Sequence, residues 1–153
     1  MNDTDSGKKA YDVLIRDYTD LDFDSVVDIL RQENLYNPAS DTRDNIYGLS
    51  ESDSSHVLVA EVDEDEKRVV GTLFLLDTFW KSMVFNFAVR ADYRGHGIGT
   101  RLVEEAKKRI ANSGADSIEI YIDADHLKAR SFFLDNFERV VEKPYKKLFL
   151  PLD

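Results

Sequence analysis

The sequence contains no cysteine, and this absence removes several kinds of site at once. Disulfide bonds, thiolate zinc sites and a covalent cysteine nucleophile are all excluded. Any chemistry must therefore use oxygen and nitrogen groups, and we expect no metal centre.

Long hydrophobic runs are also missing. The longest, such as residues 69–76, are far too short to span a bilayer. The N-terminus is polar and acidic, whereas a targeting segment is basic and then apolar. We therefore expect a cytoplasmic protein with no membrane partner.

Basic residues are few compared with acidic ones. The chain has 30 Asp and Glu against 20 Lys and Arg, a formal net charge of -10, so its average surface repels nucleic acid. We expect no nucleic-acid partner. The excess of acid is typical either of an ordinary solvated surface or of adaptation to high salt, and the sequence leaves both interpretations open.

The remaining composition suits one globular domain. The chain has 153 residues, of which 42% are hydrophobic, and only three prolines. Residues 1–10 lack apolar periodicity and predict a flexible tail, so we assign a single domain to residues 11–153.

Apolar periodicity predicts an α/β chain, a helical layer on a mixed sheet. Helices are expected over residues 23–30, 42–49, 98–110 and 127–134, the first with Asp20 or Asp22 as its N-cap. Strands are expected over residues 13–15, 56–62, 69–76, 83–89, 118–122, 140–141 and 148–150.

The helix expected over residues 98–110 has the clearest pattern. Its apolar side chains form one stripe, consisting of Ile98, Leu102, Val103, Ala106 and Ile110. Outside the stripe, Glu104 is spaced to pair with Lys108, and Glu105 with Arg109.

A glycine-rich turn leads from the apolar strand at residues 83–89 into this helix. It reads Arg94, Gly95, His96, Gly97, Ile98, Gly99, Thr100. The first amides of a helix have no partner within it and lie at the positive end of its dipole, which favours a phosphate or diphosphate. Glycine allows close backbone approach and positive φ, while Arg94 and Thr100 add a charged donor and a hydroxyl.

Two other phosphate-binding patterns do not fit this turn. The Walker loop requires a lysine after its second glycine, and none stands there. The dinucleotide pattern would place its third glycine on Thr100 or on Leu102, depending on its start. A plain helix cap remains the simplest alternative.

On these residues the sequence resembles the GNAT superfamily of N-acetyltransferases. The signature of that family is Arg or Gln, two residues, Gly, one residue, and Gly or Ala, and residues 94–99 match it; Phe87, Ala88, Val89 and Tyr93 resemble the strand and turn before it. The resemblance implies a mixed, mostly antiparallel sheet of six to seven strands flanked by about four helices. It also implies that the fourth and fifth strands splay apart to admit a coenzyme arm.

The resemblance further implies which residues bind acetyl-CoA as co-substrate. The backbone of Phe87, Ala88 and Val89 would pair with the pantetheine arm, and the amides of residues 95–100 would hold the diphosphate. A second block at residues 126–133 resembles the family pattern of Asn, two residues, Ala, two residues, an apolar residue and Tyr. By that comparison the further cofactor-binding positions are His126, Ala129, Phe132 and Phe133.

This second block departs from the family at both ends. His126 stands where Asn is usual, so it is either a cofactor ligand or an ordinary surface histidine. Phe133 stands where a tyrosine commonly protonates the departing thiolate, and a phenyl ring carries no such proton. The phenylalanines are most simply core residues, with cofactor packing as a second role.

Catalytic groups are therefore not identified by the signature. A general base is needed because an alkyl amine is protonated near neutrality, and Asp123 and Asp125 are candidates, with an N-cap or solvated turn as the plainer interpretation. Tyr121 and Tyr145 are candidates for the acid, although Tyr121 is favoured as a packing residue.

The resemblance implies direct transfer of an acetyl group to a primary amine of a small molecule or peptide. A catalytically weak acyl-CoA sensor is the alternative, because Phe133 replaces the usual tyrosine. Both a monomer and a homodimer remain open.

Overall fold

The computed structural model describes residues 10–152, so the tail predicted for residues 1–10 lies almost wholly outside the described residues. The chain forms two compact units, residues 1–121 and residues 122–153. Each is described by itself.

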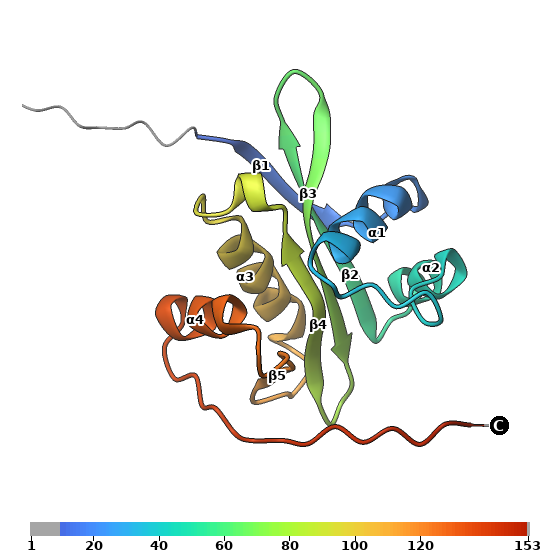
Figure 1. Cartoon of the computed structure of the whole chain (residues 1–153), viewed down its shortest axis with the longest axis vertical. Coiled ribbons are helices and arrows are strands. Elements are labelled where there is room, and N and C mark those ends of the chain that lie inside the picture. The colour runs from blue at the N-terminus through green and yellow to red at the C-terminus, as the bar shows by residue number, and fades with distance from the viewer. Residues whose placement is uncertain (1–9, 153) are drawn as a thin grey trace, which may run out of the picture. The chain divides into compact units, whose positions relative to one another are not determined.

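The first unit is built on one five-stranded sheet in the order β1-β2-β3-β4-β5 (Figure 1). All neighbours are antiparallel except β4 and β5, which are parallel. The strands are β1 (Asp12–Asp17), β2 (Ser55–Asp63), β3 (Lys67–Asp77), β4 (Ser82–Val89) and β5 (Ile118–Ile120). Five of the expected strands are thus confirmed, the fifth in a shorter form.

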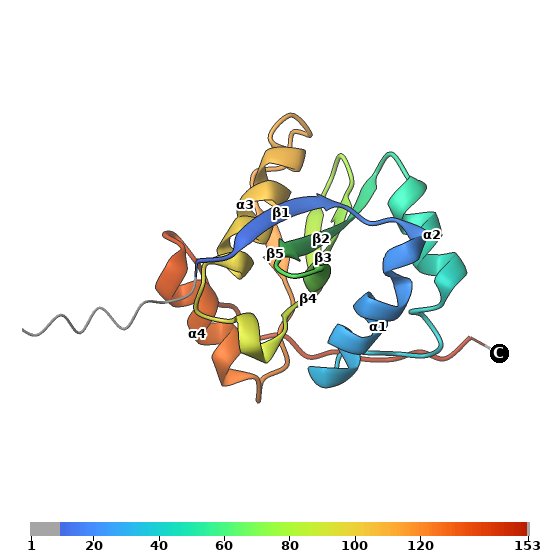
Figure 2. The same ribbon diagram turned by 90° about the horizontal axis from the view of Figure 1, so that it is seen from above.

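Helices cover both faces of this sheet. Helices α1 (Phe23–Gln32) and α2 (Arg43–Glu51) lie on one side and α3 (Ile98–Ile110) on the other, as Figure 2 shows. Two 3₁₀ turns, η1 (Asp20–Asp22) and η2 (Ala91–Tyr93), precede α1 and α3. These bounds agree with the helices expected from periodicity.

The N-caps of α1 and α2 differ in whether their side chains bind the first amides of the helix. Thr42 caps α2, because its hydroxyl accepts from the amide of Asn45 at 3.2 Å. Asp22 is the N-cap residue of α1, but its carboxylate makes no cap hydrogen bond to that helix. It binds Arg16 through two hydrogen bonds of 2.7 and 2.9 Å.

The apolar stripe of α3 packs on the sheet as expected. Leu102 and Ala106 are fully buried. A Cβ at Gly71 of β3 would lie 3.1 Å from Leu102 Cδ1 and 3.3 Å from the carbonyl oxygen of Ala88, so glycine there lets the helix lie close to the strands. Of the expected ion pairs, Glu105 with Arg109 is confirmed at 3.0 Å, but Glu104 pairs with Lys107 one position earlier than predicted.

A second core lies on the other face, under α1 and α2. It gathers buried residues of both helices and the strands, namely Tyr18, Val26, Ile29, Leu30, Ile46, Val57, Val59, Val69, Phe74 and Ala88. The hydroxyl of Tyr18 has no hydrogen-bond partner within the described residues. Burial of this group raises the pKa of Tyr18 to about 12, with the nearby carboxylate of Asp20 adding to the effect.

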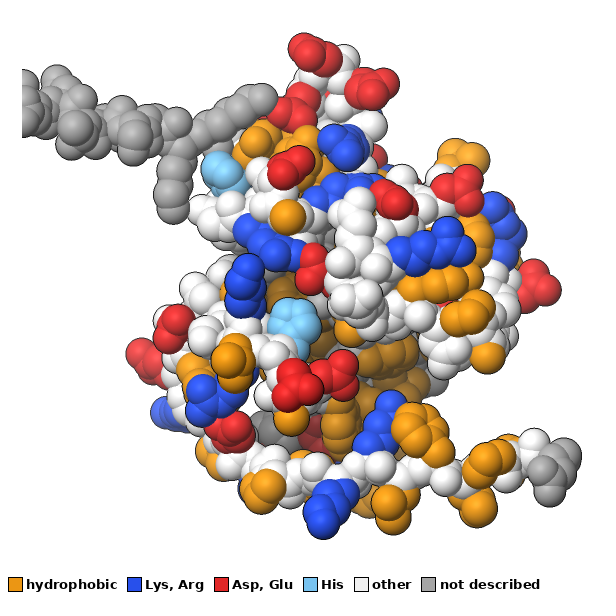
Figure 3. Space-filling view, viewed as in Figure 1, with side chains coloured by type: hydrophobic (Ala, Val, Ile, Leu, Met, Phe, Trp, Pro, Cys, Tyr) orange, Lys and Arg blue, Asp and Glu red, His pale blue; other side chains and the backbone are white. Residues whose placement is uncertain are grey.

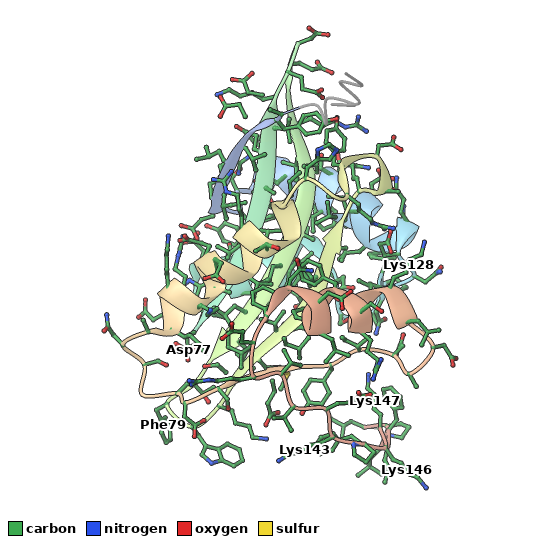
Figure 4. All side chains as sticks on the ribbon, turned by 90° about the vertical axis from the view of Figure 1, so that its left-hand side faces the viewer. Asp77, Phe79, Lys128, Lys143, Lys146 and Lys147 are labelled. Carbon is green, nitrogen blue, oxygen red and sulfur yellow. The ribbon has the colours of Figure 1, made fainter. Side chains whose placement is uncertain are left out.

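The described part of the second unit contains one helix, α4 (Leu127–Asn136), followed by an extended segment. The strands predicted at residues 140–141 and 148–150 are wrong: no strand occurs in the described part of this unit, so the expected six to seven strands are five. The reason is physical, since a strand requires a ladder partner and neither run has one among the described residues. Residues 138–152 of this segment are exposed, and Lys143, Lys146 and Lys147 project from it (Figure 4).

Candidate active site

Strand β4 extends well beyond its pairing with β5. They pair only from Ser82 with Ile118 to Val84 with Ile120, whereas β4 continues to Val89. Among the described residues, β5 ends at Ile120 and no other strand takes its place beside residues 85–89. The coenzyme-admitting splay that the resemblance implied stays a prediction, since β5 pairs with β4 over all of its three residues and then ends.

A bulge lies in β4 beyond the end of its pairing with β5. On β3, Thr72 and Phe74 are separated by one residue, whereas their partners Ala88 and Phe85 are separated by two. Asn86 and Phe87 therefore share one position, and Asn86 has a φ of 48°. Asparagine tolerates this left-handed conformation better than most residues. The bulge changes the direction of β4 just before Phe87, Ala88 and Val89.

A buried carboxylate that sequence reasoning missed contacts this bulge. Asp41, in the segment between α1 and α2, is 7% exposed. Its Oδ1 accepts from Nδ2 of Asn86 at 3.2 Å, and its Oδ2 accepts from the amide of Asn37 at 2.8 Å. Nothing in the local pattern of residues 34–55, which is rich in Asn, Asp and Ser, distinguishes Asp41 from its neighbours.

The glycine-rich turn has the backbone conformation expected of it. Gly95 and Gly97 have φ values of 77° and 78°, and a Cβ at either would meet nothing within 4 Å. Gly97 is the N-cap of α3 and offers no side chain to its first amides. Within the described residues, no hydrogen bond from the amides of Ile98, Gly99 or Thr100 is present.

The electrostatics of this turn favour an anion. The first turn of α3 contains no acidic residue, although the chain as a whole is acidic. The amides therefore point out of a positive helix end with no carboxylate to compete for them. We call these amides of residues 98–100, with the open space over Gly95 and Gly97, the anion cradle. It suits the diphosphate of a coenzyme.

Arg94 does not extend over the cradle. Its Nε donates to the carbonyl oxygen of Val89 at 3.1 Å, and its guanidinium pairs with Glu33 at the end of α1. Arg90 makes a parallel link, because its Nη1 lies 2.7 Å from Asp28 of α1. These two arginines tie the end of β4 to α1, so the arginine of the signature acts here as a brace.

Aromatic side chains pack against one another at the glycine-rich turn. The ring of Tyr11 lies 5.0 Å from that of Tyr93 and 4.8 Å from that of His96, edge to face in the second case. The hydroxyl of Tyr93 donates to Glu64 at 2.7 Å, and this hydrogen bond together with burial raises the pKa of Tyr93. Glu64 belongs to the acidic tip of the β2–β3 hairpin, seen at the top of Figure 3.

In the second unit, His126 caps α4. Its Nδ1 accepts from the amide of Ala129 at 3.1 Å, so neither Asp123 nor Asp125 provides the cap. The carbonyl oxygens of those two aspartates accept from the amides of His126 and Leu127 instead, at 2.9 and 3.0 Å.

The phenylalanines of α4 pack on one another. The rings of Phe132 and Phe133 lie 5.0 Å apart, and Phe137 lies about equally far from both, at 5.9 and 6.0 Å. Phe133 is 4% exposed, so the core role expected of it is confirmed.

The candidate tyrosines are both exposed. Tyr121 is 54% exposed and its hydroxyl donates to Glu119 at 2.8 Å, so the packing role favoured for it is wrong. Tyr145 is 74% exposed. An exposed phenol can exchange its proton with water.

Other kinds of site are not found in the described part of the chain. Among residues 10–152, no three His, Asp or Glu side chains are grouped as a metal site would require. No helix in the same range has the length and apolar character needed to cross a membrane.

Comparison with known families and structures agrees with this geometry. The model of the acetyltransferase (GNAT) family matches residues 14–137. Among solved structures, a transcriptional regulator from Bacillus halodurans C-125 is 23% identical, covering 90% of this chain and 99% of its own, with a TM-score of 0.70. An aminoglycoside acetyltransferase from an uncultured soil metagenomic sample is 20% identical (92% and 99% covered, TM-score 0.70). Glucosamine-6-phosphate N-acetyltransferase from Arabidopsis thaliana is 15% identical (90% and 98%, TM-score 0.69).

Proposed function

The chain belongs to the acetyltransferase (GNAT) family, and on that premise we propose that it is an acetyl-CoA-dependent N-acetyltransferase. The acceptor we propose is a primary amine of a small molecule or a peptide. At these identities the structural likeness shows the fold alone, so the proposal depends on the site.

The anion cradle is the observation that carries this proposal. Three amides at the start of α3 lack partners within the described residues, and two glycines with positive φ leave the space above them open. A diphosphate would accept from these amides at the positive helix end. The remaining cofactor contacts are proposed for His96, His126, Ala129, Phe132 and Phe133, as the family pattern implies. Arg94 would join them by releasing Glu33.

The end of β4 supplies the second half of the site. It runs past the end of β5, and an extended arm lying along residues 85–89 would be bound there in the manner of a strand. We propose that the backbone of Phe87, Ala88 and Val89 holds this arm. The two halves are consecutive in the chain, so a molecule with a diphosphate and a long amide arm would contact both.

Acetyl-CoA would supply the thioester that the amine attacks. The amide of Val89 is proposed to stabilise the negative charge that develops on the carbonyl oxygen. A base must first take a proton from the ammonium form of the acceptor, and Asp123 and Asp125 are proposed for this. Tyr121 or Tyr145, or water, would protonate the departing thiolate.

Phe133 motivates a second candidate function. A buried phenyl ring stands where the family usually has the tyrosine that protonates the leaving group. A protein with a working cradle and no acid would bind acyl-CoA without transferring the acyl group. Such a protein would act as a sensor.

Calorimetric titration and thiol release together test the proposal. Acetyl-CoA should bind at least about 100-fold more tightly than S-acetylpantetheine, which carries the same arm and thioester without the diphosphate. A panel of amines and amino-terminal peptides should then accelerate thiol release above the hydrolysis background. Equal affinities would rule out the cradle, and tight binding without acceptor-dependent release would favour the sensor.

A further inference from the structure

The pair formed by Asp41 and Asn86 joins two segments that the signature does not connect. Asp41 belongs to the stretch between α1 and α2, and Asn86 to the bulge of β4, 45 residues later. Asp41 is 7% exposed, so its carboxylate is removed from water and depends on protein donors. Both its oxygens have one: Asn86 for Oδ1 and the amide of Asn37 for Oδ2.

Asn86 is the bulge residue with the left-handed backbone conformation. Its φ of 48° lies in the left-handed region, where a single non-glycine residue is held only when its surroundings favour it. The hydrogen bond from its side chain to Asp41 supplies such a restraint from outside the sheet. The carboxylate thus acts on the direction of β4 immediately before Phe87.

Building on the proposed function, we infer that Asp41 is a positioning residue that fixes the β4 bulge and thereby aims the backbone of residues 87–89 at the acyl end of the coenzyme arm. The same hydrogen bond ties the segment before α2 to that strand. Asp41 acts through Asn86 and touches no reacting atom in this scheme.

If Asp41 has this role, its replacement should lower kcat much more than it lowers the affinity for acetyl-CoA. The cradle at residues 95–100 is built from α3 and its turn, with Gly71 setting the approach of that helix, and Asp41 contacts neither. Losing the bulge restraint should therefore leave acetyl-CoA affinity within about threefold, while kcat falls on the order of tenfold or more, because small displacements at a reacting centre are costly.

An exchange of the two side chains tests the inference directly. In Asp41→Asn, position 41 keeps one acceptor oxygen for two donors. In Asn86→Asp, two carboxylates face each other where 3.2 Å now separates donor and acceptor. In the double variant, position 41 donates to position 86 and still accepts from Asn37. Both hydrogen bonds therefore return, and only the one between positions 41 and 86 has its direction reversed. We expect each single variant to lose turnover and the double variant to recover most of it.

Asp22→Asn is the matched control. Asp22 is another buried aspartate of the first unit, 6% exposed, but its partners are Arg16 and Thr19. Its replacement should lower stability and leave kcat per folded molecule unchanged. If Asp22→Asn lowered kcat as much as Asp41→Asn does, the loss of turnover in Asp41→Asn would come from general destabilisation, and the inference would be overturned.

Hydrogen exchange of the unliganded protein provides a readout that does not depend on activity. Amides of residues 85–89 should exchange faster in both single variants and return to wild-type protection in the double variant. If wild type neither binds acetyl-CoA nor releases thiol, the proposed function fails, and this exchange pattern still decides whether Asp41 restrains the bulge. Unchanged protection in Asp41→Asn, or an inactive double variant beside an active Asn86→Asp, would overturn the positioning role.

Discussion

The two compact units of the chain differ in how their apolar side chains are placed. In residues 10–121, large side chains such as Phe74 are fully buried on either face of the sheet. In residues 122–152, Phe133 is the buried apolar side chain, while others such as Phe149, 79% exposed, face solvent. Apolar character is similar in the two regions, so burial depends on whether a complementary apolar face is present.

The largest expected effect compares one phenylalanine from each unit. Phe74→Ala should lower the free energy of unfolding by about 3–5 kcal/mol, because it leaves a cavity in a packed core. Phe149→Ala should change it by about 0.5 kcal/mol or less, as at most exposed positions. Urea unfolding followed by circular dichroism measures both. Similar losses from the two variants would show that the second unit hides a core of its own.

A second comparison uses two glycines with the same backbone conformation. Gly97 has a φ of 78° and Gly114 a φ of 85°, and a Cβ at either meets nothing within 4 Å. Both changes to leucine carry the same left-handed strain. Only Gly97→Leu places a side chain over the cradle, so it should weaken acetyl-CoA binding by at least about 100-fold, or roughly 2.7 kcal/mol.

Gly114→Leu serves as the control for that strain, since it lies beyond the other end of α3. Its affinity for acetyl-CoA should stay within about threefold of wild type in the same calorimetric titration. Unaltered affinity in Gly97→Leu would refute the cradle.

The contribution of ion pairs to stability should also differ between the two units. Asp22 is buried, and burial acts to raise the pKa of its carboxyl, but hydrogen bonds from Arg16 and from the amide of Thr19 outweigh burial and lower it. Asp22→Asn should cost about 2–3 kcal/mol at pH 7, since charged hydrogen bonds are lost in a buried place. The pair of Arg130 with Glu142, exposed on both sides, should show no measurable change in Tm when Glu142 becomes Gln.

The pH dependence of unfolding tests whether the pKa of Asp22 is lowered in the folded state. Because the folded-state pKa of Asp22 lies below its unfolded value, its contribution is fully present above the unfolded pKa of about 4. It is lost as the pH falls through the lowered folded pKa. Wild type and Asp22→Asn should therefore converge in stability in strong acid, and a constant gap between pH 7 and pH 2 would contradict the assignment.

The smallest expected effect is a gain. The hydroxyl of Tyr18 is buried with no partner among the described residues. On folding it loses its hydrogen bonds to water and gains none from the protein, so Tyr18→Phe removes an unfavourable contribution. Stability should rise by about 1 kcal/mol, read as a higher urea midpoint with an unchanged slope. A loss of stability would mean that the hydroxyl has a partner, such as an internal water.

The first unit could be predicted well because its signals are local. The stripe of α3 spans residues three and four apart, and the helix begins and ends as its periodicity indicates. Positive φ at Gly95 and Gly97 follows from the residue type and the turn. The strands predicted at residues 140–141 and 148–150 failed because short apolar runs do not reveal whether a ladder partner exists.

By itself, the sequence determined where the helices and the first five strands lie, and that a glycine-rich turn opens α3, since periodicity and backbone freedom depend on neighbouring residues. Only the tertiary structure decided that Arg94 turns toward Glu33 and that Asp41 reaches the bulge at Asn86. Such pairings depend on which segments the folded sheet brings together, and local sequence carries no record of a partner dozens of residues away.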